Sequence, residues 1–188
     1  MAPLILASAS PRRKQLLEWA EVPFDIIVAD TDESFPSHLS PEEVAIHIAQ
    51  HKAYAVREKA GLERPIIAAD TIVALDGDII GKPTDRNDAV AILSRLSGQT
   101  HRVITGVCIL HKEGEITFAD TTEVAFHSLT KEQLEFYVDK YKPYDKAGAY
   151  AIQEWIGVVG IKSISGDFYN VMGLPVSRVV QTLQQLGF

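Results

Sequence analysis

One stretch constrains the fold of this chain more than any other, and it has the sequence IIAADTIVAL at positions 66–75. Eight of these ten residues are apolar, so both faces of an extended strand would be apolar except at Asp70 and Thr71. Strands of this kind lie in the middle of a sheet that is covered by helices on both faces. We therefore expect residues 66–75 to form the central strand of an α/β sheet.

The remaining hydrophobic patterns predict helices and strands on either side of this strand. Capping residues begin two of the helices, with Ser10-Pro11 in the first and Ser40 with Glu43 in the second. The expected helices are 11–20, 41–59, 86–97, 130–140 and 175–186; the expected strands are 3–8, 24–29 and a short one after residues 76–78; the expected hairpins are 101–111 with 116–127, and 158–171.

The chain shows no internal repeat, low-complexity tract or linker-like shift in composition. Residues 1–188 are therefore predicted to form one domain. The expected fold is a mixed, twisted α/β sheet flanked by helices and elongated in shape. A division into two lobes around a central cleft stays open at this point.

Composition excludes several classes of protein. A net charge of −7 argues against nucleic acid or an anionic membrane as a partner. No stretch approaches the roughly 18 apolar residues of a membrane span, and the N-terminus lacks the pattern of a signal peptide. The single cysteine, Cys108, cannot form an internal disulfide, which favours a cytoplasmic location.

Three cations crowd the beginning of the first predicted helix. Arg12, Arg13 and Lys14 follow Ser10-Pro11, where the helix dipole is positive. Each charge there costs about 0.3–1 kcal/mol unless it is screened. This placement predicts a bound anion at the helix N-terminus.

Lys52 lies within an apolar stripe of the helix predicted at 41–59. A lysine there either extends to water along the edge of the core or meets a negative partner. At 100° per residue, the stripe contains Val44, Ala45, Ile48, Ala49, Ala55 and Val56.

Asp70 poses the same problem with the opposite charge. A carboxylate in a buried strand is held by backbone amides of a neighbouring loop, or it is a functional group with tuned basicity, such as a general base. Two other charged positions lie in predicted loops, where solvated side chains are the ordinary case: the acidic cluster Asp30, Asp32 and Glu33, and Lys82 within GKPTD. Gly148, between two alanines, indicates a close approach of the backbone.

Two familiar motifs are absent on inspection. GDIIGKPT, at 77–84, has a glycine spacing one residue short of a P-loop, and Pro83 stands where the helix should begin. His47 and His51 are spaced for a metal, but Ile48 stands where a zinc protease has glutamate. We interpret this histidine pair as solvated.

The charges that remain suit one kind of chemistry. Cations at a helix N-terminus bind polyphosphate, and nearby carboxylates bind Mg²⁺ or Mn²⁺, which bridge carboxylate and phosphate oxygens. Hydrolysis of a phosphoanhydride needs both, together with a carboxylate that activates water.

At these residues the sequence resembles the Maf family of nucleoside triphosphate pyrophosphatases, over essentially the whole chain. The matching segments are LASASPRRKQLL, Lys52, AADTIVALDG, GKPTD, LSGQTHRVITGV, DKAGAYAIQ and GDFYNVMGLP. The resemblance implies a fold similar to that of inosine triphosphate pyrophosphatases. It also implies cleavage between the α and β phosphates with a divalent metal, Mg²⁺ or Mn²⁺.

The resemblance also implies roles for individual residues. Asp70 matches the catalytic proton acceptor, and Glu33 matches an acidic position near the metal, which Asp70 would also contact. Phosphate-contacting or catalytic positions are matched by Ser8, Arg13, Lys52 and Lys82. Positions linked to substrate choice are matched by Arg12, Thr71 and Gln153, and this combination is similar to that of the subgroup that prefers dTTP and UTP. Modified pyrimidine nucleotides stay open as further substrates.

Two alternatives remain open at this stage. The chain could be a non-catalytic nucleotide sensor in septum formation or cell-division control, or a pyrophosphatase with a purine pocket, of the inosine triphosphate type. Pyrophosphate release from a panel of triphosphates separates these alternatives. A homodimer also stays open.

Overall fold

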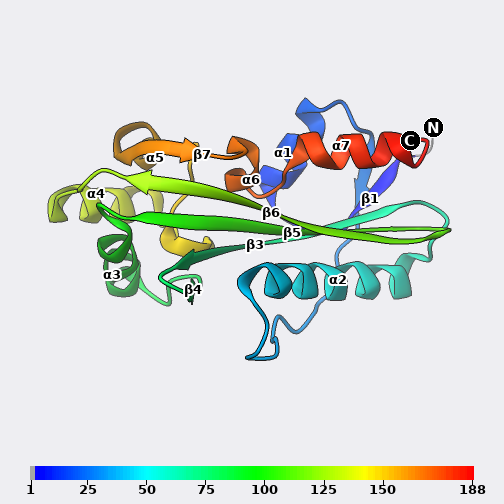
Figure 1. The fold of residues 1–188 in the computed structure, drawn as a ribbon, viewed down its shortest axis with the longest axis horizontal. Helices are drawn as coiled ribbons and strands as arrows, with labels where there is room; N and C mark the ends of the chain where they lie inside the picture. Colours follow the sequence, from blue (N-terminus) through cyan, green and yellow to red (C-terminus); the bar gives the residue numbers. More distant parts are fainter. Residues whose placement is uncertain (1–2) are drawn as a thin grey trace. The chain divides into compact units, whose positions relative to one another are not determined.

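A computed structural model describes residues 3–188, in which a seven-stranded mixed sheet is flanked by helices (Figure 1). The strands are β1 (Leu4–Leu6), β2 (Phe24–Ile26), β3 (Ile66–Leu75), β4 (Asp78–Ile80), β5 (Thr100–His111), β6 (Gly114–Phe126) and β7 (Ile161–Ser165). Their order is β2-β1-β3-β5-β6-β7, with β4 paired to β3. The pairs β1–β2 and β1–β3 are parallel, whereas β3–β4 and β6–β7 are antiparallel. The mixed sheet is confirmed, and β3 is an interior strand as predicted.

The helices begin where the sequence places their caps. Ser10 accepts a hydrogen bond from the Arg13 amide, and Ser40 forms a complete capping box with Glu43. The helices are α1 (Pro11–Trp19), α2 (Pro41–Ala60), α3 (Arg86–Leu96), α4 (Lys131–Tyr141), the 3₁₀ turn η1 (Ala147–Ala149), α5 (Trp155–Gly160), α6 (Phe168–Met172) and α7 (Val176–Gln185).

The hairpin predicted near 158–171 is wrong. Residues Trp155–Gly160 form helix α5, β7 pairs with β6, and residues Phe168–Met172 form helix α6. The β-branched residues of EWIGVVG favour a strand, but the Gly157 and Val158 amides bond to the Glu154 carbonyl and form a short helix. Gly157 packs on the carbonyl of Ile152 so closely that a Cβ would lie 1.6 Å from its oxygen.

The chain divides into two compact units. The first contains residues up to Thr71, then Thr105–Asp120 and Gly173–Phe188. The second contains Ile72–Ile104 and Thr121–Met172. Strands β3, β5 and β6 therefore contribute residues to both units.

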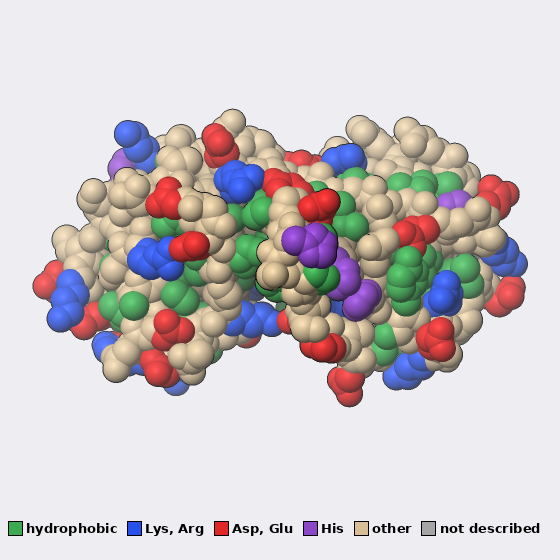
Figure 2. Space-filling model, turned by 60° about the horizontal axis from the view of Figure 1, so that its bottom comes forward, with side chains coloured by type: hydrophobic (Ala, Val, Ile, Leu, Met, Phe, Trp, Pro, Cys, Tyr) green, Lys and Arg blue, Asp and Glu red, His purple; other side chains and the backbone are tan. Residues whose placement is uncertain are grey.

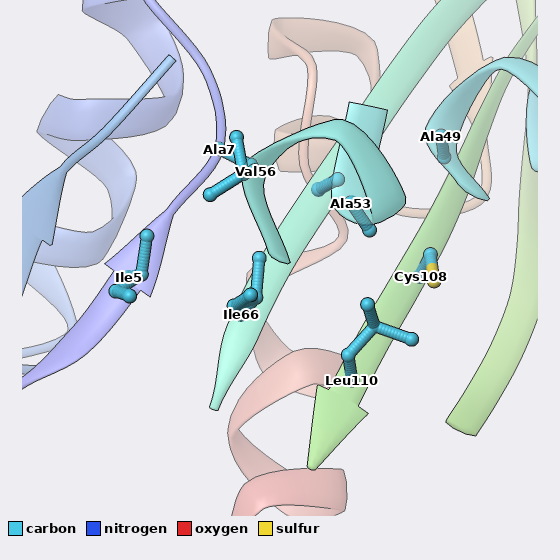
Figure 3. Packing of buried hydrophobic residues seen from close by; sticks show 9 residues of the cluster. Ile5, Ala7, Ala49, Ala53, Val56, Ile66, Cys108 and Leu110 are labelled. Atoms are coloured by element: carbon cyan, nitrogen blue, oxygen red, sulfur yellow. The ribbon is translucent and has the colours of Figure 1, made fainter. Parts of the chain in front are cut away.

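In the first unit, α2 covers one face of the strands, and α1 and α7 cover the other (Figure 1). Aliphatic residues and Cys108 from α2, β3, β5 and the segment of β1 with Ala7 form the core under α2 (Figure 3). The labelled members are Ile5, Ala7, Ala49, Ala53, Val56, Ile66, Cys108 and Leu110. The buried stripe of α2 is the predicted one except that Ala53 replaces Ala55, which is only half-buried. Gly106 of β5 fixes the position of α2, because a Cβ there would lie 2.2 Å from the Ala45 carbonyl carbon.

In the second unit, α3 packs against α4 and η1. A buried aromatic cluster joins His101, Phe126 and Tyr150 in edge-to-face contacts, with ring centroids 5.0–5.4 Å apart. Charged side chains of both signs are interspersed on the face shown in Figure 2. Across residues 3–188 there is no helix with the length and hydrophobicity needed to span a membrane.

Candidate active site

The guanidinium of Arg13 is buried at the start of α1 and is held by three oxygen atoms of the first unit. Nε donates to the Gly173 carbonyl at 2.7 Å, Nη1 to Ser8 Oγ at 3.2 Å, and Nη2 to Thr71 Oγ1 at 3.0 Å. All three acceptors are uncharged. The protein thus orients this cation through neutral groups, and its charge is left to interact with an anion.

A second contact set lies around Lys52 of α2. Its ammonium nitrogen is 2.7 Å from Asp70 Oδ1 and 2.8 Å from Glu33 Oε1. The Lys52 and Asp70 side chains are largely buried, at 19% and 15% exposure, whereas that of Glu33 is half exposed. The negative partner that the apolar stripe required is therefore present, and it is the carboxylate that the sequence analysis singled out.

The alternation of side chains along β3 explains why the two sets are separate. Neighbouring residues of a strand point to opposite faces. Asp70 meets Lys52 of α2, and Thr71 meets Arg13 of α1. The helices α2 and α1 cover opposite faces of the strands in this unit (Figure 1).

Electrostatics connect the two sets. Burial lowers the pKa of Arg13, while the nearby Asp70 carboxylate raises it; Arg12 lowers it and Glu33 raises it. The link in geometry is β3 itself, because Asp70 and Thr71 are consecutive residues and contact Lys52 and Arg13 respectively. The first unit therefore brings together Ser8, Arg12, Arg13, Glu33, Lys52, Asp70 and Thr71.

The carboxylates of Glu33 and Asp70 suit a hard divalent cation. Both approach one cation, the Lys52 ammonium, within 2.8 Å. Within residues 3–188, no three His, Cys, Asp or Glu side chains lie close enough to form a metal site by themselves. Mg²⁺ is commonly bound by one or two carboxylates together with substrate phosphates and water, so this pair fits such an ion.

The histidine pair of α2 does not join the site chemistry. The His47 and His51 rings pack against each other with centroids 4.1 Å apart, and His51 is exposed. This agrees with the interpretation of a solvated pair.

Lys82 and Gln153 belong to the second unit. Lys82 is exposed in the loop between β4 and α3, where Asp85 caps α3. The preceding carbonyl, of Gly81, accepts a hydrogen bond from the Gly148 amide at 3.1 Å. A Cβ on Gly148 would lie 2.8 Å from Val73 Cγ2, so the close backbone approach expected of this glycine is confirmed.

The segment that carries Gln153 is anchored by buried tyrosines. The Tyr137 hydroxyl donates to Glu154 and accepts from the Ala151 amide at 3.1 Å. The Tyr150 hydroxyl lies 2.6 Å from His101 Nε2. Gln153 itself is exposed between these anchored residues, where its amide is available to a ligand.

The sequence profile described as Maf-like protein matches residues 3–186. The chain belongs to the Maf family. A protein of Bacteroides fragilis (strain YCH46) named dTTP/UTP pyrophosphatase is 47% identical over 184 residues, which cover 97% of this chain and 95% of that protein. A dTTP/UTP pyrophosphatase of Cytophaga hutchinsonii is 48% identical over 97% of this chain and 84% of its own length.

The Maf chain also has a solved structural relative. A HAM1 protein from Coxiella burnetii covers 98% of this chain, and all of that chain is matched, with a TM-score of 0.53 and 15% identity. At this identity the likeness concerns the fold alone, and it confirms the expected architecture.

Two residues of this Maf chain contact the site and were missed by sequence reasoning. Thr105 is fully buried on β5, and its hydroxyl lies 2.8 Å from that of Thr71. Gly173 supplies the carbonyl bound by Arg13 and has φ of +122°, which favours glycine. A hydroxyl within the apolar strand VITGVCIL was a signal for Thr105, whereas Gly173 gave none.

Proposed function

We propose that this chain is a nucleoside triphosphate pyrophosphatase that cleaves dTTP and UTP to the monophosphate and pyrophosphate. One observation carries the proposal: Thr71 of β3 contacts a buried guanidinium held by three neutral oxygens, and the preceding residue, Asp70, belongs to a lysine–carboxylate cluster. The first arrangement binds phosphate, and the second can accept a proton from water. The names of the Bacteroides and Cytophaga relatives support the substrate class.

In the proposed reaction, water attacks the α-phosphorus and the bond to the α–β bridging oxygen breaks. Asp70 accepts the proton from water, and pyrophosphate leaves with the electron pair of the broken bond. Lys52 lies 2.7 Å from Asp70, so it orients this carboxylate. Ser8 and Arg13 bind phosphate oxygens. When bound, Mg²⁺ or Mn²⁺ held by Glu33 and Asp70 would neutralise charge on the phosphates.

We assign the remaining candidates to substrate choice and to leaving-group stabilisation. Lys82 is proposed to stabilise charge on the leaving pyrophosphate, and Arg12 and Gln153 to affect which nucleotide is accepted. Thr71, which the resemblance also links to substrate choice, contacts the Arg13 guanidinium. The amide of Gln153 can pair with the donor and acceptor edge of uracil or thymine. The proposed setting is the cytoplasmic nucleotide pool, and a homodimer remains a prediction.

The decisive test is Asp70→Asn. This variant keeps the size of the side chain and removes its basicity, so kcat for UTP should fall by about 10²- to 10⁴-fold while the circular dichroism spectrum is retained. Asp76→Asn is the matched control, because Asp76 is exposed in the turn after β3 and undergoes the same loss of charge. Wild-type turnover in Asp70→Asn would remove Asp70 from the mechanism.

A substrate panel separates the alternative functions. We expect pyrophosphate release from UTP and dTTP to exceed release from ITP, XTP and GTP, and Gln153→Ala to alter that ratio. A protein that binds these nucleotides with Mg²⁺ or Mn²⁺ and releases no pyrophosphate would be a sensor. A preference for ITP would indicate the purine type.

A further inference from the structure

The hydroxyl of Thr71 is surrounded by protein groups. Its oxygen accepts a hydrogen bond from Arg13 Nη2 at 3.0 Å, lies 2.8 Å from Thr105 Oγ1, and lies 3.4 Å from the Gly173 carbonyl. A threonine hydroxyl has one donor and two acceptor sites. These three neighbours use all of its capacity when Thr105 donates to Thr71 and Thr71 donates to Gly173.

Thr105 restricts this hydroxyl further. It is fully buried on β5, the strand next to β3, so its side chain is held in one position. A hydroxyl that can rotate freely offers its lone pair in several directions. Contact with the fixed Thr105 oxygen leaves the Thr71 lone pair directed at Arg13.

The orientation of the guanidinium plane follows from these contacts. Gly173 and Thr71 accept from Nε and Nη2, which share one edge of the guanidinium, and Ser8 accepts from Nη1, so contacts at all three nitrogens define its plane. Three of the five N–H groups of Arg13 are committed to the protein, and two remain to meet an anion. The direction of those two groups depends on the plane that Thr71 helps to set.

We propose that Thr71 and Thr105 form a hydroxyl pair that positions Arg13, so that both threonines act on the substrate through the guanidinium and not through the base. Thr105 is thereby a positioning residue that the resemblance does not assign. The inference rests on the proposed function in one respect, that Arg13 binds the triphosphate. It gives Thr71 a definite route of action that can be separated from base recognition.

The test uses inorganic tripolyphosphate, a ligand that has no base. Binding to the full chain with Mg²⁺ is measured by calorimetry for Thr71→Val, Thr71→Ser, Thr105→Val and Thr105→Ser. A hydrogen bond to a charged group is lost in Thr71→Val, so the Kd should rise by about tenfold or more, and by about threefold in Thr105→Val. Each serine variant keeps the hydroxyl and should restore binding, which a role of the methyl group in packing would not allow.

Kinetics supply the second readout. In both valine variants kcat/KM should fall by the same factor for UTP, dTTP and GTP, because a phosphate contact is common to all three. If Thr71 contacts the base, the ratio of UTP to GTP changes and tripolyphosphate binding does not. That result overturns the inference.

A double-mutant cycle shows whether the effect passes through Arg13. Lysine has no Nη2 group, so Thr105→Val in an Arg13→Lys background should leave tripolyphosphate binding unchanged from Arg13→Lys alone. If instead Thr105→Val weakened tripolyphosphate binding by the same factor in the Arg13→Lys background as in the wild type, the inference would be overturned. The proposed function is tested separately: it fails if the wild-type chain releases no pyrophosphate from any triphosphate. The binding of tripolyphosphate by the variants would still decide the role of the two threonines.

Discussion

His101 is a buried titratable residue that the proposed reaction does not use. It is 1% exposed on β5, it bonds to Tyr150 through Nε2, and burial lowers its pKa from 6.5 to about 4. The unfolded chain therefore binds a proton between these values that the folded chain does not bind. The stabilising contribution is complete above pH 6.5 and is lost as the pH falls toward 4.

We expect the free energy of unfolding to fall by up to about 3 kcal/mol over this window because of His101 alone. Urea denaturation of the wild type and of His101→Gln, at pH 7.5 and at pH 4.5, isolates this contribution, since glutamine can still bond to Tyr150. His51→Gln, at an exposed histidine, should match the wild type at both values. The prediction would be contradicted if acidification lowered the free energy of unfolding of the wild type by no more than it lowered that of His101→Gln.

Gly148 tests how closely two segments of the second unit approach. Its φ of +71° and the Cβ contact of 2.8 Å with Val73 both oppose an alanine. Gly77 has φ of +88° but open space around it, so Gly77→Ala carries only the backbone cost, of about 1–2 kcal/mol. Gly148→Ala should lose about 1–3 kcal/mol more through overpacking, measured by thermal or urea denaturation. If Gly148→Ala and Gly77→Ala lost the same stability, Val73 would have moved aside without an energetic cost.

Single residues also show what the sequence could predict of the site. Lys52 and Asp70 stood out because a charge in an apolar pattern needs a partner, and they proved to be partners of each other. Thr105 and Gly173 were not singled out: the hydroxyl of Thr105 within an apolar strand was a weak signal, and nothing near either residue in sequence shows which side chain it contacts. Their contacts with the site join positions 34 and 160 residues apart in sequence.

At the scale of elements, local signals predicted helix ends well. Ser10 and Ser40 cap α1 and α2, and the side-chain bonds involved join residues three apart. Helix α5 was not predictable in this way, since its valine and isoleucine residues favour a strand, and the sequence does not show that Gly157 packs closely on Ile152. Asn170 of α6 is likewise buried and bonds to Val103 and Thr122. Such contacts have no signature within the segment itself.

The two capping boxes provide a prediction for α2 and α4. Ser40→Ala and Thr130→Ala each remove a side chain that accepts from the N3 amide, so each should cost about 1 kcal/mol of stability in urea denaturation. Ser94→Ala, in the last turn of α3, is the control and should be near neutral, because its hydroxyl bonds to the Val90 carbonyl and alanine favours a helix. Lys52 lies about three turns from Ser40, so Ser40→Ala should leave kcat for UTP unchanged. If Ser40→Ala and Thr130→Ala lost no more stability than Ser94→Ala, the stabilising role of the two capping residues would be contradicted.

At the scale of the whole molecule, the division into two units left no trace in the sequence. The boundaries fall inside β3, β5 and β6, at Thr71, Ile104 and Asp120, and again after Met172. Linkers are recognised by a change in composition, but a boundary within a strand keeps the strand's own apolar pattern. A division of this kind becomes visible only from tertiary contacts.

The same boundaries predict how the chain unfolds. The backbone passes between the units four times, and three strands continue from one unit into the other, so unfolding one unit disrupts strands that the other shares. We therefore expect one cooperative transition. Hydrogen exchange measured by mass spectrometry at increasing urea should give the same midpoint for peptides from α2, in the first unit, and α4, in the second. If α4 exchanged at a clearly lower urea concentration while α2 stayed protected, the two units would be independently stable. In that case Gly148→Ala would favour unfolding of the second unit alone, and the Lys52–Asp70 contact of the first unit would remain.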